Sequence, residues 1–140
     1  MTLQELIQKY PKIFENYEGN PYGVNWEAPK AWLPVIDDMC GAIQSYIDTV
    51  VWYKDGVESR PVQVKCTQMK EKWGGLRFYT RGADDTVEGM ISMATYICRR
   101  MCESCGTREN LGITNGWVSI CCQNCYDAGK AGGGDWKLKN

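Results

Sequence analysis

Cysteine content is the feature of this sequence that bears most directly on chemistry. The chain has 140 residues, with eight cysteines and no histidine. Without an imidazole it cannot form Ser-His-Asp or Cys-His nucleophiles, and it cannot build a His-ligated zinc hydrolase or deaminase site. The chemistry that remains is centred on thiols.

Four of the cysteines form two C-x2-C pairs with the spacing of a metal site. Cys102 and Cys105 form the first pair, and Cys122 and Cys125 follow after sixteen intervening residues. Each pair spans a tight turn that aims both sulfurs at one point, and Gly106 allows the backbone to turn toward the thiolates. We predict one structural Zn²⁺, because four thiolates leave no coordination position for a water.

Other assignments of the cysteines remain open. Two disulfides would need an oxidising compartment, and four thiolates could also hold an iron–sulfur cluster. Cys121 adjoins Cys122, and either could be the ligand, although the repeated x2 spacing favours Cys122. Cys98 lies one helical turn before the first pair. Cys40 and Cys66 fall on apolar faces and are interpreted as core residues.

A basic and aromatic segment is the second candidate site. Residues 70–79 read Lys-Glu-Lys-Trp-Gly-Gly-Leu-Arg-Phe-Tyr, and residues 60–81 carry six basic side chains and one acidic one. Cations beside flat aromatic faces suit a ligand that carries both phosphate and a ring. The candidate ligand- or partner-binding residues are Lys70, Lys72, Trp73, Arg77 and Tyr79.

A purely structural interpretation of the same segment competes with the binding one. In it, Trp73 and Phe78 pack into the core and the lysines only keep the protein soluble. Spacing alone favours this interpretation. It explains least well why Arg77 and Tyr79 should point together off the sheet.

Helices and a hairpin are expected to position these residues. Thr2 and Glu5 form a capping-box pattern, and Asp84 is a candidate N-cap. Apolar spacing predicts helices over residues 3–10, 34–51 and 85–101, with an ordered loop over 16–31 and a turn at 55–56. Strands are expected over 61–70 and 76–81, joined at Gly74-Gly75, with a smaller hairpin around 115–120.

The expected fold class is α+β, with helices packed on a small antiparallel sheet. Residues 1–97 would form this domain, including the hairpin over 61–81. Residues 98–128 would form a treble-clef-like or ribbon-like zinc module packed on it. Residues 129–140 read as a Gly-rich flexible tail, which Trp136 could pin back.

Charge is divided unevenly along the chain. The first 59 residues carry four lysines and nine acidic residues, whereas residues 60–140 carry twelve basic and eight acidic ones. The net charge of −1 argues against a protein whose whole surface neutralises phosphates, so any anion-binding role belongs to the second part. We see no secretory signal and no membrane span, and expect a cytoplasmic protein with no membrane partner.

Residues 32–126 resemble a family of small bacterial and bacteriophage proteins of unassigned function. Its members usually read Lys-Glu-Lys-Phe-Gly-Gly-Leu-Arg-Phe-Tyr and often close the cysteine site with Cys-x2-His. Here Trp73 keeps the aromatic character, and Cys125 keeps a zinc-ligand type. The resemblance implies a bacterial cytoplasm, that of the host if the protein comes from a phage, and it implies no reaction.

The favoured function is therefore non-catalytic binding. We expect a zinc-stabilised protein that uses the basic and aromatic segment to bind an anionic partner, either a host protein or a nucleotide-type ligand. By analogy, a phage protein could use such a surface in counter-defence. The alternative is a nucleic-acid-binding regulator. An enzyme is not expected, because the sequence has no paired-carboxylate motif, phosphate loop or Ser-x-x-Lys pattern.

Overall fold

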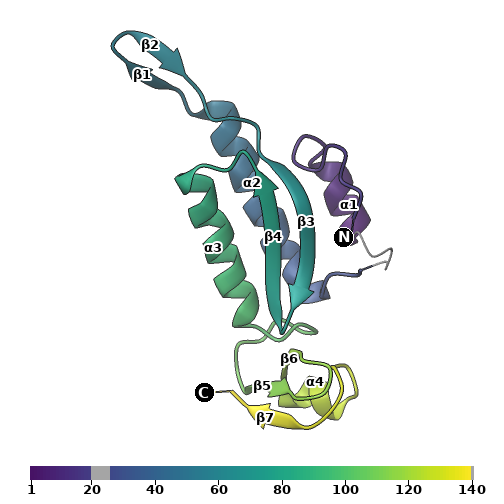
Figure 1. The fold of residues 1–140 in the computed structure, drawn as a ribbon. Coiled ribbons are helices and arrows are strands. Elements are labelled where there is room, and N and C mark those ends of the chain that lie inside the picture. Colours follow the sequence, from purple (N-terminus) through teal and green to yellow (C-terminus); the bar gives the residue numbers. More distant parts are fainter. Residues whose placement is uncertain (20–25, 140) are drawn as a thin grey trace.

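The computed structural model describes residues 1–19 and 26–139. Two layers form the main body, with helices on one side of a two-stranded hairpin, and a small cysteine-rich module lies at one end (Figure 1). The expected α+β class is confirmed. The elements are α1 (Leu3–Lys9), the 3-10 turn η1 (Lys30–Trp32), α2 (Leu33–Thr49), β1 (Trp52–Lys54), β2 (Val57–Ser59), β3 (Lys65–Lys72), β4 (Gly75–Arg81), α3 (Asp85–Arg99), β5 (Leu111–Thr114), β6 (Ile120–Cys122), α4 (Gln123–Asp127) and β7 (Trp136–Leu138).

The core lies between the helices and one face of the β3–β4 hairpin. The apolar stripe expected on α2 is buried, and α3 adds a second stripe. From the hairpin, Met69, Leu76 and Phe78 face this core. Cys40 and Cys66 lie within it, as expected, and burial raises the pKa of the Cys66 thiol to about 12. These two thiols are packing residues.

Capping residues fix where the first and third helices begin. Thr2 and Glu5 make both hydrogen bonds of the capping box at the start of α1. At the start of α3, a carboxylate oxygen of Asp84 accepts the backbone N–H of Val87 at 3.0 Å. Both caps were expected from the sequence pattern.

The hairpin differs from its sequence-based outline at both ends. The strand expected to begin at residue 61 begins at Lys65, and Val62 is exposed, because the chain leaves the ladder after Arg81 through Gly82, whose φ is +86°. The turn is Trp73-Gly74 rather than Gly74-Gly75. Both turn residues have positive φ, +51° and +79°, as two-residue hairpin turns of type I′ require.

The segment expected to be a flexible tail folds back onto the module instead. Residues 136–138 form β7, which pairs antiparallel with β5 in a sheet of order β6-β5-β7. The indole Nε1 of Trp136 donates to the carbonyl of Cys121 at 3.0 Å. The ring lies so close over Gly112 that a Cβ there would sit 2.0 Å from it. Trp136 thus holds the end of the chain.

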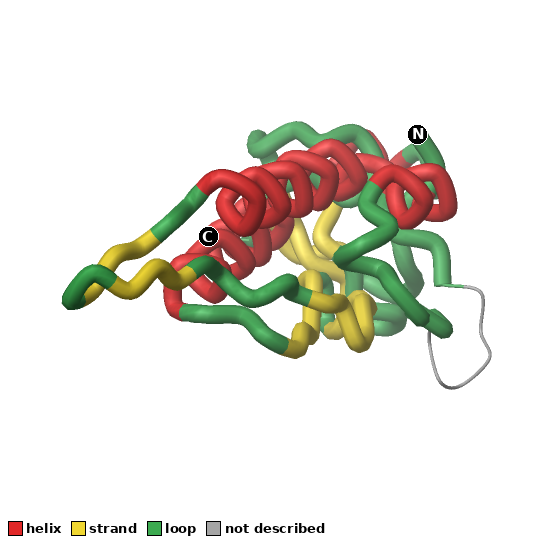
Figure 2. The backbone as a smooth tube through the Cα atoms, turned by 90° about the horizontal axis from the view of Figure 1, so that it is seen from above, coloured by secondary structure: helices red, strands yellow, loops and turns green. Residues whose placement is uncertain are grey.

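A second hairpin, β1–β2, lies at the end of the body opposite the module (Figure 1) and projects beyond the helices when seen from above (Figure 2). All six of its strand residues are exposed. Within the described ranges 1–19 and 26–139, none of the helices has both the length and the apolar character that crossing a bilayer takes.

Candidate metal centre and basic hairpin face

The first cysteine pair lies in a tight knuckle directly after α3. The carbonyl of Cys102 accepts the N–H of Gly106 at 2.8 Å, and the N–H of Cys102 donates to the carbonyl of Thr107 at 2.8 Å. Gly106 has φ +82°, a backbone conformation that side chains disfavour. The role expected for Gly106 in the turn therefore holds.

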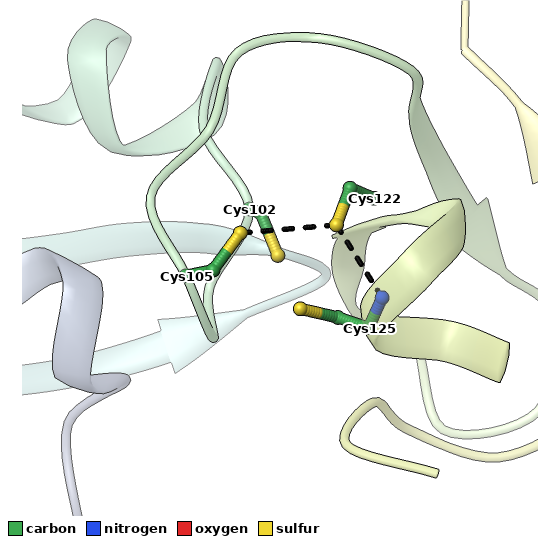
Figure 3. Close-up of side chains that lie close together, drawn as sticks. All are labelled: Cys102, Cys105, Cys122 and Cys125. Atoms are coloured by element: carbon green, nitrogen blue, oxygen red, sulfur yellow. Dashed lines mark hydrogen bonds between the residues drawn. The ribbon is translucent and has the colours of Figure 1, made fainter. Parts of the chain in front are cut away.

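The second pair lies where β6 runs into α4. Cys122 ends β6 and caps α4, since its Sγ accepts the backbone N–H of Cys125 at 3.4 Å. Figure 3 shows the sulfurs of the two pairs pointing toward one another from the knuckle and from α4. Burial alone would raise the pKa of the Cys102 thiol, but hydrogen bonds from the backbone amides of Cys105, Cys122 and Ser104 lower it to about 6. Burial, followed by the neighbouring thiols, raises the pKa of the Cys125 thiol to about 12, so without a metal the thiols of this group differ in how readily they ionise.

The four sulfurs have the spacing of one metal centre. All of them lie within 4.8 Å of one another, and the Sγ atoms of Cys105 and Cys122 are 3.8 Å apart. A tetrahedral zinc ion with bonds of about 2.3 Å sets its sulfurs about 3.8 Å apart. All eight cysteines are free thiols. The group therefore fits a structural metal ion bound by Cys102, Cys105, Cys122 and Cys125.

The two neighbouring cysteines lie outside this group. Cys121 is buried on the opposite side of β6 from Cys122, since successive strand residues face opposite ways, and its carbonyl accepts the Trp136 indole. Cys98 is fully buried in the main core, where burial raises the pKa of its thiol to about 12. Of the two adjacent cysteines, Cys122 and not Cys121 therefore belongs to the four-cysteine group.

The basic and aromatic candidates lie on the solvent side of the β3–β4 hairpin. In the ladder Lys70 pairs with Arg77, and Gln68 pairs with Tyr79. Since side chains alternate along a strand, these residues share one face with Lys72, while the intervening residues face the core. Trp73 lies at the turn. We call Lys70, Lys72, Trp73, Arg77 and Tyr79 the basic hairpin face.

Side-chain exposure separates the two interpretations of this segment. Trp73 is 71% exposed and Tyr79 is 46% exposed, whereas Phe78 is buried. The expectation that Trp73 packs into the core is wrong, because Trp73 lies in the turn beyond the last pair of the ladder; the same expectation for Phe78 is right.

Cations and rings are in contact on the basic hairpin face. The Lys70 ammonium lies 5.7 Å from the centre of the Tyr79 ring, and the Lys72 ammonium lies 4.8 Å from that of Trp73. Elsewhere Lys9, Arg60 and Lys65 form ion pairs with carboxylates. Among residues 1–19 and 26–139, no carboxylate forms such a pair with Lys70, Lys72 or Arg77. Their charge is left to solvent or to a ligand.

The cysteine-rich module and the tip of the β3–β4 hairpin are in direct contact. A Cβ placed on Gly74 would lie 2.9 Å from the side chain of Ile120 in β6, so the turn packs against the strand that leads to Cys122. Glu103, inside the knuckle, exchanges backbone hydrogen bonds with Ile120, donating its N–H and accepting with its carboxylate, both at 3.0 Å. Sequence reasoning missed Glu103 and Ile120, because no local pattern marks a contact between segments this far apart.

A cavity of about 370 Å³ lies beside this junction. Its lining includes the acids Glu27, Glu71 and Glu103 and the bases Lys30 and Lys130. Burial raises the pKa of the Glu103 carboxyl to about 7. The lining therefore carries charged side chains of both signs.

Comparisons with other proteins leave the family open. The resemblance carried by residues 70–79 and the cysteine pairs stays a prediction. No family model, no curated protein and no solved structure matches this chain.

Proposed function

We propose that this protein is a non-catalytic binding protein, stabilised by one zinc ion, whose basic hairpin face binds an anionic partner. The observation that carries the proposal is the set of three cations, Lys70, Lys72 and Arg77, on one open face without a carboxylate partner in the described residues. Two exposed rings lie among them. Such a face can bind phosphate or carboxylate groups with its charges and a planar group with its rings.

The turn adds support for a binding role. Trp73 is a large apolar side chain, mostly in water, at a positive φ that few residues other than glycine adopt. Neither core packing nor backbone preference explains a tryptophan here. Strained positions that packing does not explain are concentrated at functional sites.

In this proposal the bound metal ion is zinc, and its role is structural. The order of a knuckle, a hairpin and a helix carrying the last ligand supports a treble-clef-like module. Four thiolates close the coordination sphere and leave no open position for a water or substrate. Because β6 contacts the turn at Gly74, the module would hold the tip of the hairpin in place.

The partner we favour is a small nucleotide-type ligand or an acidic surface of a host protein. The test is a calorimetric titration with a nucleoside triphosphate and, in parallel, with a single-stranded oligonucleotide, each at two or more salt concentrations. Nucleic-acid binding would weaken steeply with salt, with a slope set by the phosphates neutralised. Binding of the nucleotide with a shallow salt dependence is the expected result.

Charge-neutralising variants locate the site. The double variant Lys70→Gln, Arg77→Gln should bind the nucleoside triphosphate at least about ten-fold more weakly, since a hydrogen bond to a charged group contributes roughly 1.5 to 3 kcal/mol. Lys54→Gln, Lys137→Gln removes two exposed cations elsewhere and is the matched control. Equal loss in both variants would show binding by overall charge alone and contradict the proposal.

A further inference from the structure

Helix α3 has an apolar stripe that faces away from the body. Its inner side buries Val87, Ile91, Ala94 and Cys98. On the opposite side, Met93 is 61% exposed and Tyr96 is 59% exposed. Gly89, Met93 and Tyr96 follow one another at helical spacing, so they form one continuous strip. In Figure 1, α3 lies at an outer edge of the fold, where it packs against α2 and β4.

Gly89 has no role inside the molecule that requires a glycine. A Cβ placed there would meet no atom within 4 Å, and the backbone is ordinary helix. Glycine in the middle of a helix lowers stability relative to alanine. A glycine on an open face is explained when another body must approach the backbone closely.

We propose that α3 packs antiparallel against α3 of a second copy of this chain, about a two-fold axis that passes between Ser92 and Met93. This axis places Gly89 opposite Tyr96 of the second copy, and Ser92 opposite Met93. Each large side chain then meets a small one. Self-complementarity of this kind is what a two-fold interface requires.

The charged residues at the two ends of α3 fit the same two-fold axis. The axis that pairs Gly89 with Tyr96 also places Asp85 opposite Arg100 of the second copy. The Arg100 guanidinium lies 5.3 Å from the centre of the Tyr96 ring on the same helix, so its charge stays on this strip. In a parallel arrangement Tyr96 would meet Tyr96 and Arg100 would meet Arg100. The antiparallel arrangement is the one that opposes unlike charges and unlike sizes together.

The contact is modest in size. One face of a single helix buries less than the roughly 1,200 Å² of a stable interface, so the dimer belongs to the weak class. We expect a dissociation constant on the order of 10 to 100 μM. The inference concerns α3 alone and does not depend on what the basic hairpin face binds.

Sedimentation velocity of the zinc-loaded protein over a concentration series tests the proposal. The wild type should shift from monomer to dimer as concentration rises, and Met93→Glu should stay monomeric because it places two carboxylates at the axis. Tyr53→Ser, which removes an exposed ring from the projecting hairpin, is the control and should dimerise normally. A wild type that stays monomeric throughout, or a Tyr53→Ser variant as defective as Met93→Glu, overturns the proposal.

Four further variants test the register and guard against misfolding. Asp85→Arg and Arg100→Asp should each weaken the dimer about ten-fold, and the double variant should restore it because the pairs re-form with reversed sign. Gly89→Ala should raise the midpoint of thermal unfolding while it weakens the dimer. Failure of the double variant to recover, or an unchanged dimer in Gly89→Ala, contradicts the antiparallel register.

Discussion

Lys70 and Arg77 occupy directly opposite positions in the β3–β4 ladder, so two cations face each other on the open side of the hairpin. Like charges directly opposite in an antiparallel pair are destabilising. The rest of the fold offsets this cost, because the other face of the same strands packs Met69, Leu76 and Phe78 into the core. A cost of this kind is expected where charge serves binding rather than stability.

Neutralising one member of this pair should stabilise the protein. Arg77→Gln removes the repulsion, leaves the Lys70–Tyr79 contact in place and is expected to raise the free energy of unfolding by about 0.2 to 1 kcal/mol at low salt. The gain should shrink as salt screens the charges. Urea denaturation at two salt concentrations measures it, with Arg77→Lys as the charge-retaining control. A Gln variant that is less stable than the wild type at low salt would contradict the prediction.

The second cysteine pair allows a sharp test of which neighbour is the ligand. Serine is a good helix N-cap, so Cys122→Ser keeps the cap of α4 and removes only the thiolate. We expect this variant to lose bound zinc, measured by elemental analysis of the purified protein. Cys121→Ser, the adjacent control, should retain one zinc per chain. The reverse result would mean that the ligand assignment is wrong.

Removing the metal should unfold the module but not the body. The module has its own small cluster of buried residues, dominated by the cysteines themselves, whereas α2, α3 and the hairpin share a larger core. Without the metal, the thiolates repel one another or take up protons. The free energy of metal binding that stabilises the folded module is then lost. A strong chelator should abolish hydrogen-exchange protection over residues 102–139. Protection of α2 should persist, and its loss would show that the two parts unfold together.

Local patterns in the sequence were enough to predict α1, α2, α3, the β3–β4 hairpin in outline and the four-cysteine group. Caps such as Thr2 and Asp84, apolar spacing on α2 and α3, and the repeated C-x2-C all act within a few residues, where spacing alone determines geometry. The alternation that puts Arg77 on the face opposite Phe78 is equally local, whereas Lys70 reaches that face only because an irregularity between Cys66 and Gln68 shifts the register of β3.

Long-range contacts could not be predicted in the same way. A glycine-rich segment before Trp136 is typical of a flexible tail, and only the docking of the indole over Gly112 turns it into a sheet strand. The contact between Gly74 and Ile120 likewise depends on how two independently formed hairpins meet. The turn position at Trp73 was missed because glycine is the residue expected at positive φ.

The Trp136 indole is expected to anchor the last strand, β7, to the module. Trp136→Ala removes the indole that bonds the Cys121 carbonyl and covers Gly112, and it should lower the free energy of unfolding of the module by about 2 to 3 kcal/mol. Trp117→Ala removes a tryptophan that is 73% exposed and should have little effect. Thermal unfolding of the zinc-loaded variants measures both. Equal losses would show that Trp136 does not anchor the chain end.

Asp84 should make stability depend on pH in the acid range. A hydrogen bond from the Tyr46 hydroxyl at 2.6 Å, and then one from the Val87 amide, hold the pKa of the Asp84 carboxyl below its usual value of 3.8. The folded state therefore favours the ionised form. The stabilisation is fully present above pH 3.8 and is lost as the pH falls through the lowered pKa.

Two substitutions separate the charge of Asp84 from its capping role. Asp84→Asn keeps a capping oxygen but cannot ionise, so its free energy of unfolding should lose only the part of the pH dependence that Asp84 contributes. Asp84→Ala also removes the cap, which should cost a further amount of about 1 kcal/mol at neutral pH. Urea denaturation between pH 2 and 6, about the range over which a carboxyl with a lowered pKa titrates, measures both. Because metal is released on acidification in every variant, the comparison rests on the difference from wild type at each pH. If Asp84→Asn matches the wild type at every pH, including below 3.8, the Tyr46–Asp84 bond does not stabilise the folded state through charge.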